Sequence, residues 1–165
     1  GYIDVESSVG KGTALRVYLP FAGEGTVDRE EASSKEPEPV KGKGTVLVVD
    51  DDEEICSVVE AILTDLGYSV LIAANGEQAV REYERRGDSI DVVLVDMVMP
   101  KFDGPACFRR LRKLDPGAKV ILTTGFSVHG EVDALLEEGA VDFITKPFDL
   151  VALSEAVYKA AHQPR

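Results

Sequence analysis

From residue 45 onward, short apolar runs alternate five times with segments in which apolar residues recur at helical spacing. Strands are expected at Thr45–Asp50, Tyr68–Ala74, Asp91–Val95, Lys119–Thr123 and Val141–Thr145. Helices are expected at about 52–66, 76–86, 104–114, 127–138 and 150–161, with Asp52, Asn75 and Asp149 near their starts. This alternation predicts an α/β fold with a doubly wound, mostly parallel sheet that carries helices on both faces.

Three zones differ in composition. Residues 1–22 read as a β-hairpin, with strands at Tyr2–Glu6 and Thr13–Leu19 around a glycine-containing turn. Residues 23–43 contain few large apolar side chains and are rich in Glu, Lys, Ser, Pro and Gly, so they are expected to form a flexible linker. Residues 44–165 form the predicted folded domain.

Charge and cysteine content narrow the function classes. The chain has 165 residues and a net charge of −12, which argues against nucleic acid or an anionic membrane as a direct partner. Cys56 and Cys107 lack metal-ligand spacing and are expected to be reduced thiols. There is no run long enough to span a membrane, no signal-peptide pattern and no initiator methionine, so the sequence looks like a fragment of a longer protein.

Polar residues follow four of the predicted strands. Asp50 and Asp51 follow the first, Asp96 the third, Thr124 the fourth and Lys146 the fifth. In the flavodoxin-like (βα)5 order 2-1-3-4-5, strands one and three are neighbours at the topological switch point, where ligands bind at the carboxyl ends of the strands. The three carboxylates should therefore crowd together, and like charges this close need a cation.

Magnesium suits this acidic set, because it prefers hard oxygen ligands and is commonly held by one or two carboxylates plus phosphate oxygens. Asp96 is then a candidate nucleophile, since a carboxylate can attack phosphorus to give an aspartyl phosphate. Mg²⁺ would bridge Asp51, Asp96 and a phosphoryl oxygen. Lys146 would supply a positive charge on the other side, and Thr124 a hydroxyl for a third oxygen.

Four segments together resemble the receiver domain of two-component response regulators. They are VLVVDDDEEI (46–55), VVLVDMVMPKFDG (92–104), ILTTGF (121–126) and FITKPF (143–148), in the family's order. The resemblance implies an acidic metal pair at Asp50 and Asp51, with Asp51 the direct ligand, and a phosphoacceptor at Asp96. It also implies a metal-binding backbone carbonyl at Val98, a switch hydroxyl and aromatic at Thr124 and Phe143, a site amine at Lys146 and a cis Lys146–Pro147 peptide.

The same resemblance implies a function. A receiver takes a phosphoryl group from a phosphohistidine, either on its own kinase core or on a partner chain, and catalyses its own phosphorylation and dephosphorylation. A histidine phosphotransfer protein is a further expected partner. Phosphorylation is expected to switch the face made by the fourth helix, fifth strand and fifth helix, around 127–161, with Phe143 turning inward.

The first residues resemble the end of a histidine-kinase ATP-binding domain. GYIDVESSVGKGTALRVYLP looks like its last glycine box and closing strands, with Gly10, Gly12 and Thr13 as the GxGT element. The rest of the ATP site is absent, so this chain is not expected to bind ATP. The parent is then expected to be a bacterial hybrid sensor kinase, with or without a membrane anchor, whose C-terminal receiver lies in the cytoplasm.

Three alternatives stay open. A phosphatase of the haloacid-dehalogenase class would need an acidic residue two positions after the nucleophile, where Val98 stands. A nucleotide- or flavin-binding module would need a phosphate-cradling loop after strand one, where three aspartates stand instead. A degenerate receiver would act as a docking module without phosphorylation, which the intact set of acids, hydroxyl and amine opposes.

Overall fold

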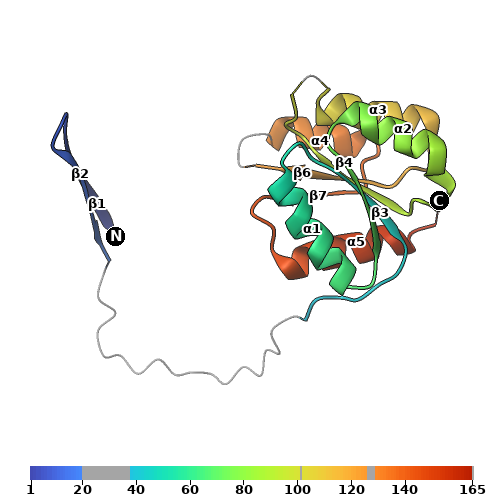
Figure 1. Cartoon of the computed structure of the whole chain (residues 1–165), viewed down its shortest axis with the longest axis horizontal. Helices are drawn as coiled ribbons and strands as arrows, with labels where there is room; N and C mark the ends of the chain where they lie inside the picture. The colour runs from blue at the N-terminus through green and yellow to red at the C-terminus, as the bar shows by residue number, and fades with distance from the viewer. Residues whose placement is uncertain (20–37, 101, 126–128, 165) are drawn as a thin grey trace. The chain divides into compact units, whose positions relative to one another are not determined.

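The computed structural model describes residues 1–19, 38–100, 102–125 and 129–164, which fall into two units (Figure 1). The N-terminal unit is an antiparallel hairpin of β1 (Tyr2–Ser8) and β2 (Gly12–Tyr18). β1 is two residues longer than expected because its pairing continues to Ser8, and β2 has the expected length but begins and ends one residue earlier. Gly10 and Gly12 have positive φ angles at the turn, which glycine adopts without strain.

The α/β unit contains a five-stranded parallel sheet in the order β4-β3-β5-β6-β7. Counted within this sheet, the order is 2-1-3-4-5, which confirms the predicted topology. Its strands are β3 (Thr45–Val49), β4 (Ser69–Ala73), β5 (Val92–Asp96), β6 (Val120–Thr124) and β7 (Asp142–Thr145). Its helices are α1 (Glu53–Asp65), α2 (Gly76–Arg86), η1 (Gly87–Ser89), α3 (Gly104–Leu114), α4 (His129–Glu137) and α5 (Leu150–His162).

Two apolar cores lie on the two faces of the sheet, and alternation along β5 shows how they are divided. Val93 and Val95 point into a core shared with α2, α3 and α4, whereas Val92 and Leu94 point into one shared with α1 and α5. The same two helical layers are visible in Figure 1. Because β5 is covered on both faces, all five of its residues are buried, as expected for a central parallel strand.

Side-chain caps start the helices where the sequence predicts them. Asp52 accepts hydrogen bonds from the N–H groups of Glu54 and Ile55 at the start of α1. Asn75 and Asp149 cap α2 and α5 in the same way. These caps satisfy amide groups that a helix leaves without a partner in its first turn. Strand ends differ slightly from expectation, since Asp96 and Thr124 are the last residues of β5 and β6 rather than the residues after them.

Residues 38–43, here called the strap, belong to the α/β unit although their composition predicts flexible linker. The Val40 N–H donates to Oγ of Ser154 in α5 at 3.0 Å. The Gly42 N–H donates to the carbonyl oxygen of Leu66 at 2.9 Å. Ordered contacts with the sheet and helices therefore begin before residue 44.

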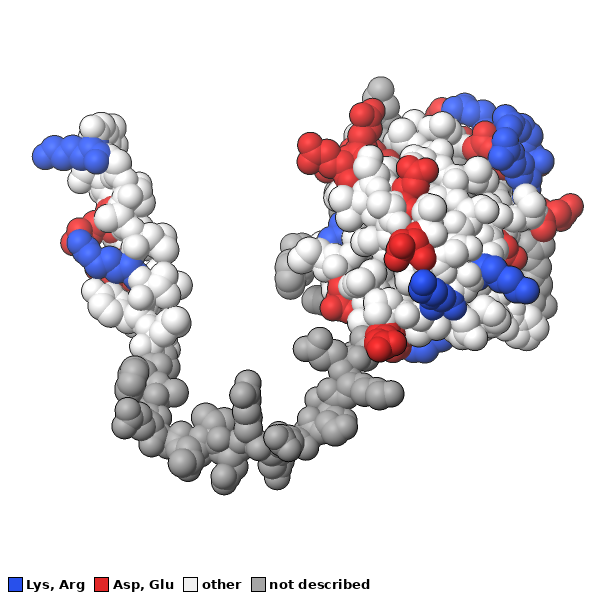
Figure 2. Space-filling model, turned by 60° about the horizontal axis from the view of Figure 1, so that its bottom comes forward, with Lys and Arg blue, Asp and Glu red and all other residues white. Residues whose placement is uncertain are grey.

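Acidic side chains form a broken band across the visible face of the α/β unit, while basic side chains form one group at a corner and stand separately lower on the same face (Figure 2). Among the helices of the described ranges, none is both long enough and apolar enough to cross a membrane.

Candidate functional site

Three carboxylates meet at the carboxyl edge of the sheet. Asp50 and Asp51 follow β3, and Asp96 ends β5, the neighbouring strand. One oxygen of each of the three side chains lies within 4.8 Å of the others. Asp50 and Asp96 are buried, whereas Asp51 is exposed to solvent. The predicted acidic cluster is therefore present.

Lys146 reaches this cluster from the far edge of the sheet. It follows β7, and its Nζ lies 2.6 Å from Asp50 Oδ2 and 3.1 Å from Asp96 Oδ2. Its backbone N–H donates to the carbonyl oxygen of Thr124, and the Lys146–Pro147 peptide is cis, as expected. Three carboxylates and one ammonium leave a formal excess of two negative charges, which matches a divalent cation.

Burial and charge act in opposite directions on Asp96 and Lys146. Burial is the largest effect on Asp96 and raises the pKa of its carboxyl, and Asp50 raises it further, whereas Lys146 and the Val98 N–H lower it without cancelling the rise. For Lys146, burial lowers the pKa, but Asp50 and Asp96 together outweigh burial and the net pKa is raised. The ammonium form of Lys146 is therefore the stable form at neutral pH.

The other predicted residues lie around this centre. Thr124 is buried at the end of β6, and its hydroxyl donates to the Gly125 carbonyl oxygen at 2.9 Å, not to Asp96. The Phe143 side chain in β7 is 38% exposed and so is turned at least partly toward solvent. Val98 is 66% exposed at its side chain, while its backbone N–H bonds to Asp96.

Comparison with known proteins identifies the family. Residues 46–158 match the response regulator receiver domain. The chain belongs to this family. It is a receiver domain of two-component signalling, joined to an N-terminal hairpin by residues 20–37, which lie outside the described ranges.

Named relatives agree with this assignment. Sensor kinase CckA of Brucella abortus is 33% identical over 163 residues, covering 95% of this chain and 17% of that protein. Transcriptional regulatory protein ZraR of Salmonella typhimurium is 35% identical over 127 residues, covering 76% of this chain and 28% of that protein. The chain thus spans about a sixth to about a quarter of the length of these relatives.

Solved structures share the receiver fold. A response regulator receiver domain protein from Clostridium thermocellum has a TM-score of 0.70 and 32% identity, covering 72% of this chain and 94% of that one. A CheX–CheY–BeF3–Mg complex from Borrelia burgdorferi gives a TM-score of 0.69 and 32% identity, covering 73% and 90%.

Receiver domains bind Mg²⁺ at an acidic pocket, and the donors of this receiver fit that ion. Asp50, Asp51 and Asp96 offer hard carboxylate oxygens, the ligand type that Mg²⁺ prefers. Both oxygens of Asp50 already have partners, since Oδ1 accepts from the Asp52 N–H and Oδ2 contacts Lys146. Asp51 is exposed, so of the pair it is the more accessible carboxylate.

Gly104 is a site residue that the sequence reasoning missed. A Cβ at this position would lie 2.4 Å from the Asp96 carbonyl oxygen and 2.6 Å from Met97 Cα, too close for any side chain. The start of α3 therefore packs directly on the backbone of Asp96 and Met97. A glycine immediately after the N-cap Asp103 was the available signal, but many helices begin with glycine for other reasons.

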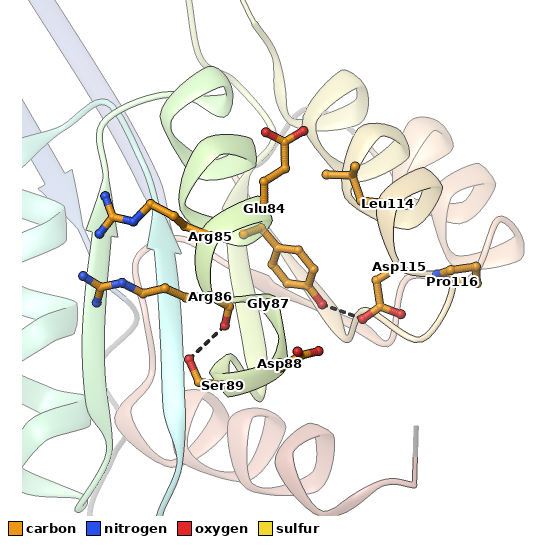
Figure 3. Close-up of a pocket in the computed structure, with 10 residues that line it drawn as sticks. Glu84, Arg85, Arg86, Gly87, Asp88, Ser89, Leu114, Asp115 and Pro116 are labelled. Carbon is orange, nitrogen blue, oxygen red and sulfur yellow. Dashed lines mark hydrogen bonds between the residues drawn. The ribbon is translucent and has the colours of Figure 1, made fainter.

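A hollow of about 730 Å³ lies away from these residues, between the C-terminal end of α2, η1 and the end of α3 (Figure 3). Its wall includes Tyr83, whose hydroxyl donates to Asp115 Oδ2 at 2.8 Å. Arg85 and Arg86 point away from Leu114 and Pro116 on the opposite wall (Figure 3). The hollow lies at the amino edge of the receiver's sheet, and none of the acidic-cluster residues or Lys146 lines it.

Proposed function

We propose that the receiver accepts a phosphoryl group on Asp96 from a phosphohistidine, with Mg²⁺ as the required cofactor. The observation that carries the proposal is the position of Asp96. Its buried carboxylate lies within 4.8 Å of the acids that follow β3 and 3.1 Å from the ammonium of Lys146, which also contacts Asp50. Phosphoryl transfer depends on alignment and charge neutralisation more than on covalent machinery, and this site supplies both.

The transfer would proceed by attack of an Asp96 carboxylate oxygen on phosphorus. A P–O bond forms as the P–N bond to the donor imidazole breaks, and the bonding pair returns to the imidazole nitrogen. Lys146 neutralises charge on the phosphoryl oxygens, and bound Mg²⁺ would supply the remaining neutralisation through Asp51, Asp96 and the Val98 carbonyl. The Thr124 hydroxyl, now bonded to Gly125, would turn to a phosphoryl oxygen.

That rotation of Thr124 is the proposed start of the switch. Removing the hydroxyl from the Gly125 carbonyl frees the backbone at Gly125, and the partly exposed Phe143 ring turns inward into the space that the Thr124 side chain leaves. The surface that changes is formed by α4, β7 and α5. The change is a population shift, because the phosphorylated state is favoured by the contacts it adds at Thr124 and Lys146.

The donor would approach over a groove of about 600 Å³ beside Lys146. Ile55, Val58 and Ile62 of α1 line one side, and Pro147 and Phe148 line the other. Val58 is 56% exposed although it is apolar, which suits a protein partner. We propose that this partner is the phosphohistidine domain of a histidine kinase, in the same chain or another, or a histidine phosphotransfer protein.

We further propose that residues 1–22 are the end of a kinase ATP-binding domain and that residues 23–43 include the linker to the receiver of a hybrid kinase. The similarity to sensor kinase CckA supports this, since it covers 95% of the chain and therefore extends beyond the α/β unit into the hairpin. The remaining ATP site is absent from this sequence, so no kinase activity is proposed for it.

The deciding experiment incubates the full chain with acetyl phosphate and Mg²⁺ and measures the intact mass. We expect the wild type to gain one phosphoryl group, the Asp96→Ala variant to gain none, and the gain to disappear without Mg²⁺. An Asp142→Ala variant, which removes a carboxylate from β7, serves as the control and should be phosphorylated. A folded wild-type chain that gains no mass would instead support a degenerate receiver that acts by docking.

A further inference from the structure

Ser154 in α5 is a buried polar residue that the proposed phosphoryl chemistry does not use. Its hydroxyl donates to the Val151 carbonyl oxygen at 2.8 Å and accepts from the Val40 N–H of the strap at 3.0 Å. It is 0% exposed, so water cannot replace Val40 while the strap is in place. Loss of the strap contact would leave the hydroxyl oxygen without this donor, which is costly for a buried group.

The strap also fits closely at a second point. Gly42 donates to the Leu66 carbonyl oxygen, and a Cβ on Gly42 would lie 1.9 Å from the Tyr68 hydroxyl oxygen. The Gly42 carbonyl oxygen in turn lies 2.5 Å from where a Cβ on Gly67 would stand, and Gly67 has a φ of 99°. Both glycines are therefore required for the strap to lie against the turn between α1 and β4, so the contact is specific.

The anchor at Ser154 is linked to the phosphorylation site through the start of α5. Lys146, which contacts both Asp50 and Asp96, is separated from α5 only by Pro147, Phe148 and the N-cap Asp149. Ser154 follows in the second turn of the helix. A displacement of Lys146 is therefore transmitted to Ser154 through residues 147–149 and the first turns of α5.

We propose that the strap is a release element, held by α5 when Asp96 is unphosphorylated and freed when Asp96 is phosphorylated. This inference rests on the proposed phosphorylation of Asp96. A phosphoryl group draws the Lys146 ammonium away from Asp50, and the connection to α5 moves with it. The first turns of α5 then shift, and the Val40–Ser154 hydrogen bond is lost because such bonds weaken steeply with distance and angle.

Release would change how the receiver is tethered to the chain that precedes it. With the strap docked, residues 38–43 are held against α1 and α5. With the strap freed, the linker lengthens by these residues. Phosphorylation would thus regulate the reach between the receiver and the preceding domain without requiring a partner on the receiver surface.

Amide hydrogen exchange of the full, ¹⁵N-labelled chain tests the inference, with Val40 and Gly42 as the reporting amides. Phosphorylation by acetyl phosphate and Mg²⁺ should speed exchange at both by about tenfold, the change expected for losing one buried hydrogen bond. In the unphosphorylated chain, Ser154→Ala should speed exchange at Val40 by a similar factor. Ser57→Ala is the matched control, because Ser57 also bonds a helix carbonyl, that of Glu53, but does not touch the strap.

Each outcome has a defined meaning when intact mass is measured on the same sample. A chain that gains the phosphoryl group without faster exchange at Val40 and Gly42 overturns the release mechanism and leaves the proposed function intact. A chain that gains no mass overturns both. Unchanged Val40 exchange in Ser154→Ala would show that α5 does not hold the strap. A Gly42→Ala variant tests the docking of the strap independently of Ser154, because the added methyl displaces the strap from Tyr68.

Discussion

The Nζ of Lys146 lies 2.6 Å from Oδ2 of Asp50, a residue that is only 4% exposed. Lys146 is thus a counter-charge for Asp50 as well as for Asp96, the proposed phosphoacceptor, 3.1 Å away. The amine and a bound cation therefore share the task of neutralising one cluster. This relationship makes stability and metal binding depend on each other.

Replacing Lys146 with Met should expose that dependence. The variant leaves two buried carboxylates without their ammonium, and we expect the free energy of unfolding at pH 7 to fall by about 3 kcal/mol, the usual cost of breaking a buried pair. Added Mg²⁺ should recover part of this loss. Urea unfolding measures both effects. Lys159→Met, which removes an exposed pair with Glu155, should change stability by less than about 0.5 kcal/mol.

The raised pKa of Asp96 predicts how the stability of the chain changes with pH. Burial raises its native pKa, so the native state holds this proton more tightly than the unfolded chain does. Stability should therefore fall as pH rises from the ordinary carboxyl range through the raised pKa. Without Mg²⁺, Asp96→Asn should be more stable than the wild type at pH 7, and the difference should vanish below the ordinary value of 3.8.

Thermal unfolding across this pH range measures the difference. The exposed Asp88→Asn is the control and should follow the wild-type curve at every pH. An Asp96→Asn curve parallel to that of the wild type would contradict the raised pKa.

Gly104 should not tolerate even one methyl group. Gly104→Ala places a Cβ against the Asp96 carbonyl oxygen, so α3 or the end of β5 must move, at a cost of about 2 kcal/mol or more. Phosphoryl uptake at Asp96 should slow as well. Gly130→Ala in α4 is the control, since its Cβ meets no atom of the described residues within 4 Å. Equal stability of the two variants in urea would show that the close approach is unimportant.

Thr124 is expected to control the switch more than the transfer. In Thr124→Ala the chain should still gain a phosphoryl mass, but the NMR signals of the Phe143 ring should no longer change on phosphorylation. Thr124→Ser keeps the hydroxyl and should restore the change. A normal Phe143 response in the alanine variant would remove Thr124 from the mechanism.

The two cysteines offer a test of packing that does not involve the site. Burial raises the pKa of Cys56 to about 11 and that of Cys107 to about 12. At pH 8 their thiolate fractions are then about 100-fold or more below that of an exposed thiol, and alkylation by iodoacetamide should slow at least as much. Urea should restore ordinary rates. Rapid alkylation of the native chain would contradict the burial of Cys56 on α1 and Cys107 on α3.

Sequence patterns predicted the sheet order, the helix caps and the meeting of Asp50, Asp96 and Lys146, because each follows from periodicity and from where strands end. Asp52, Asn75 and Asp149 are caps in the structure because their side chains reach the first amides of a helix. Individual side-chain contacts could not be predicted from these patterns. The Thr124 hydroxyl donates to the Gly125 carbonyl oxygen, and this choice of partner depends on the side-chain rotamer, which the hydrophobic periodicity does not determine.

The strap shows a second reason why sequence patterns do not predict every part of the structure. Val40 is the strap's only sizeable aliphatic side chain and the strap also contains Pro39, so composition favours a linker. However, Val40 and Gly42 are held through backbone amides, which nearly every residue carries. Gly42 fits against Tyr68 because glycine has no side chain, and a hydropathy pattern does not predict such a fit. The N-terminal end of the receiver's ordered structure could therefore be found only from three-dimensional contacts.

Lys146 enters the site on the strand at the edge of the sheet, and this has a consequence for biosynthesis. Asp96 leaves the ribosome fifty residues before Lys146, a delay of several seconds at ordinary elongation rates, and Asp50 leaves it ninety-six residues before. During that interval Asp50 and Asp96 have no ammonium to separate them. A nascent chain that stops before β7 would thus depend on a bound cation alone to offset the repulsion between the two carboxylates.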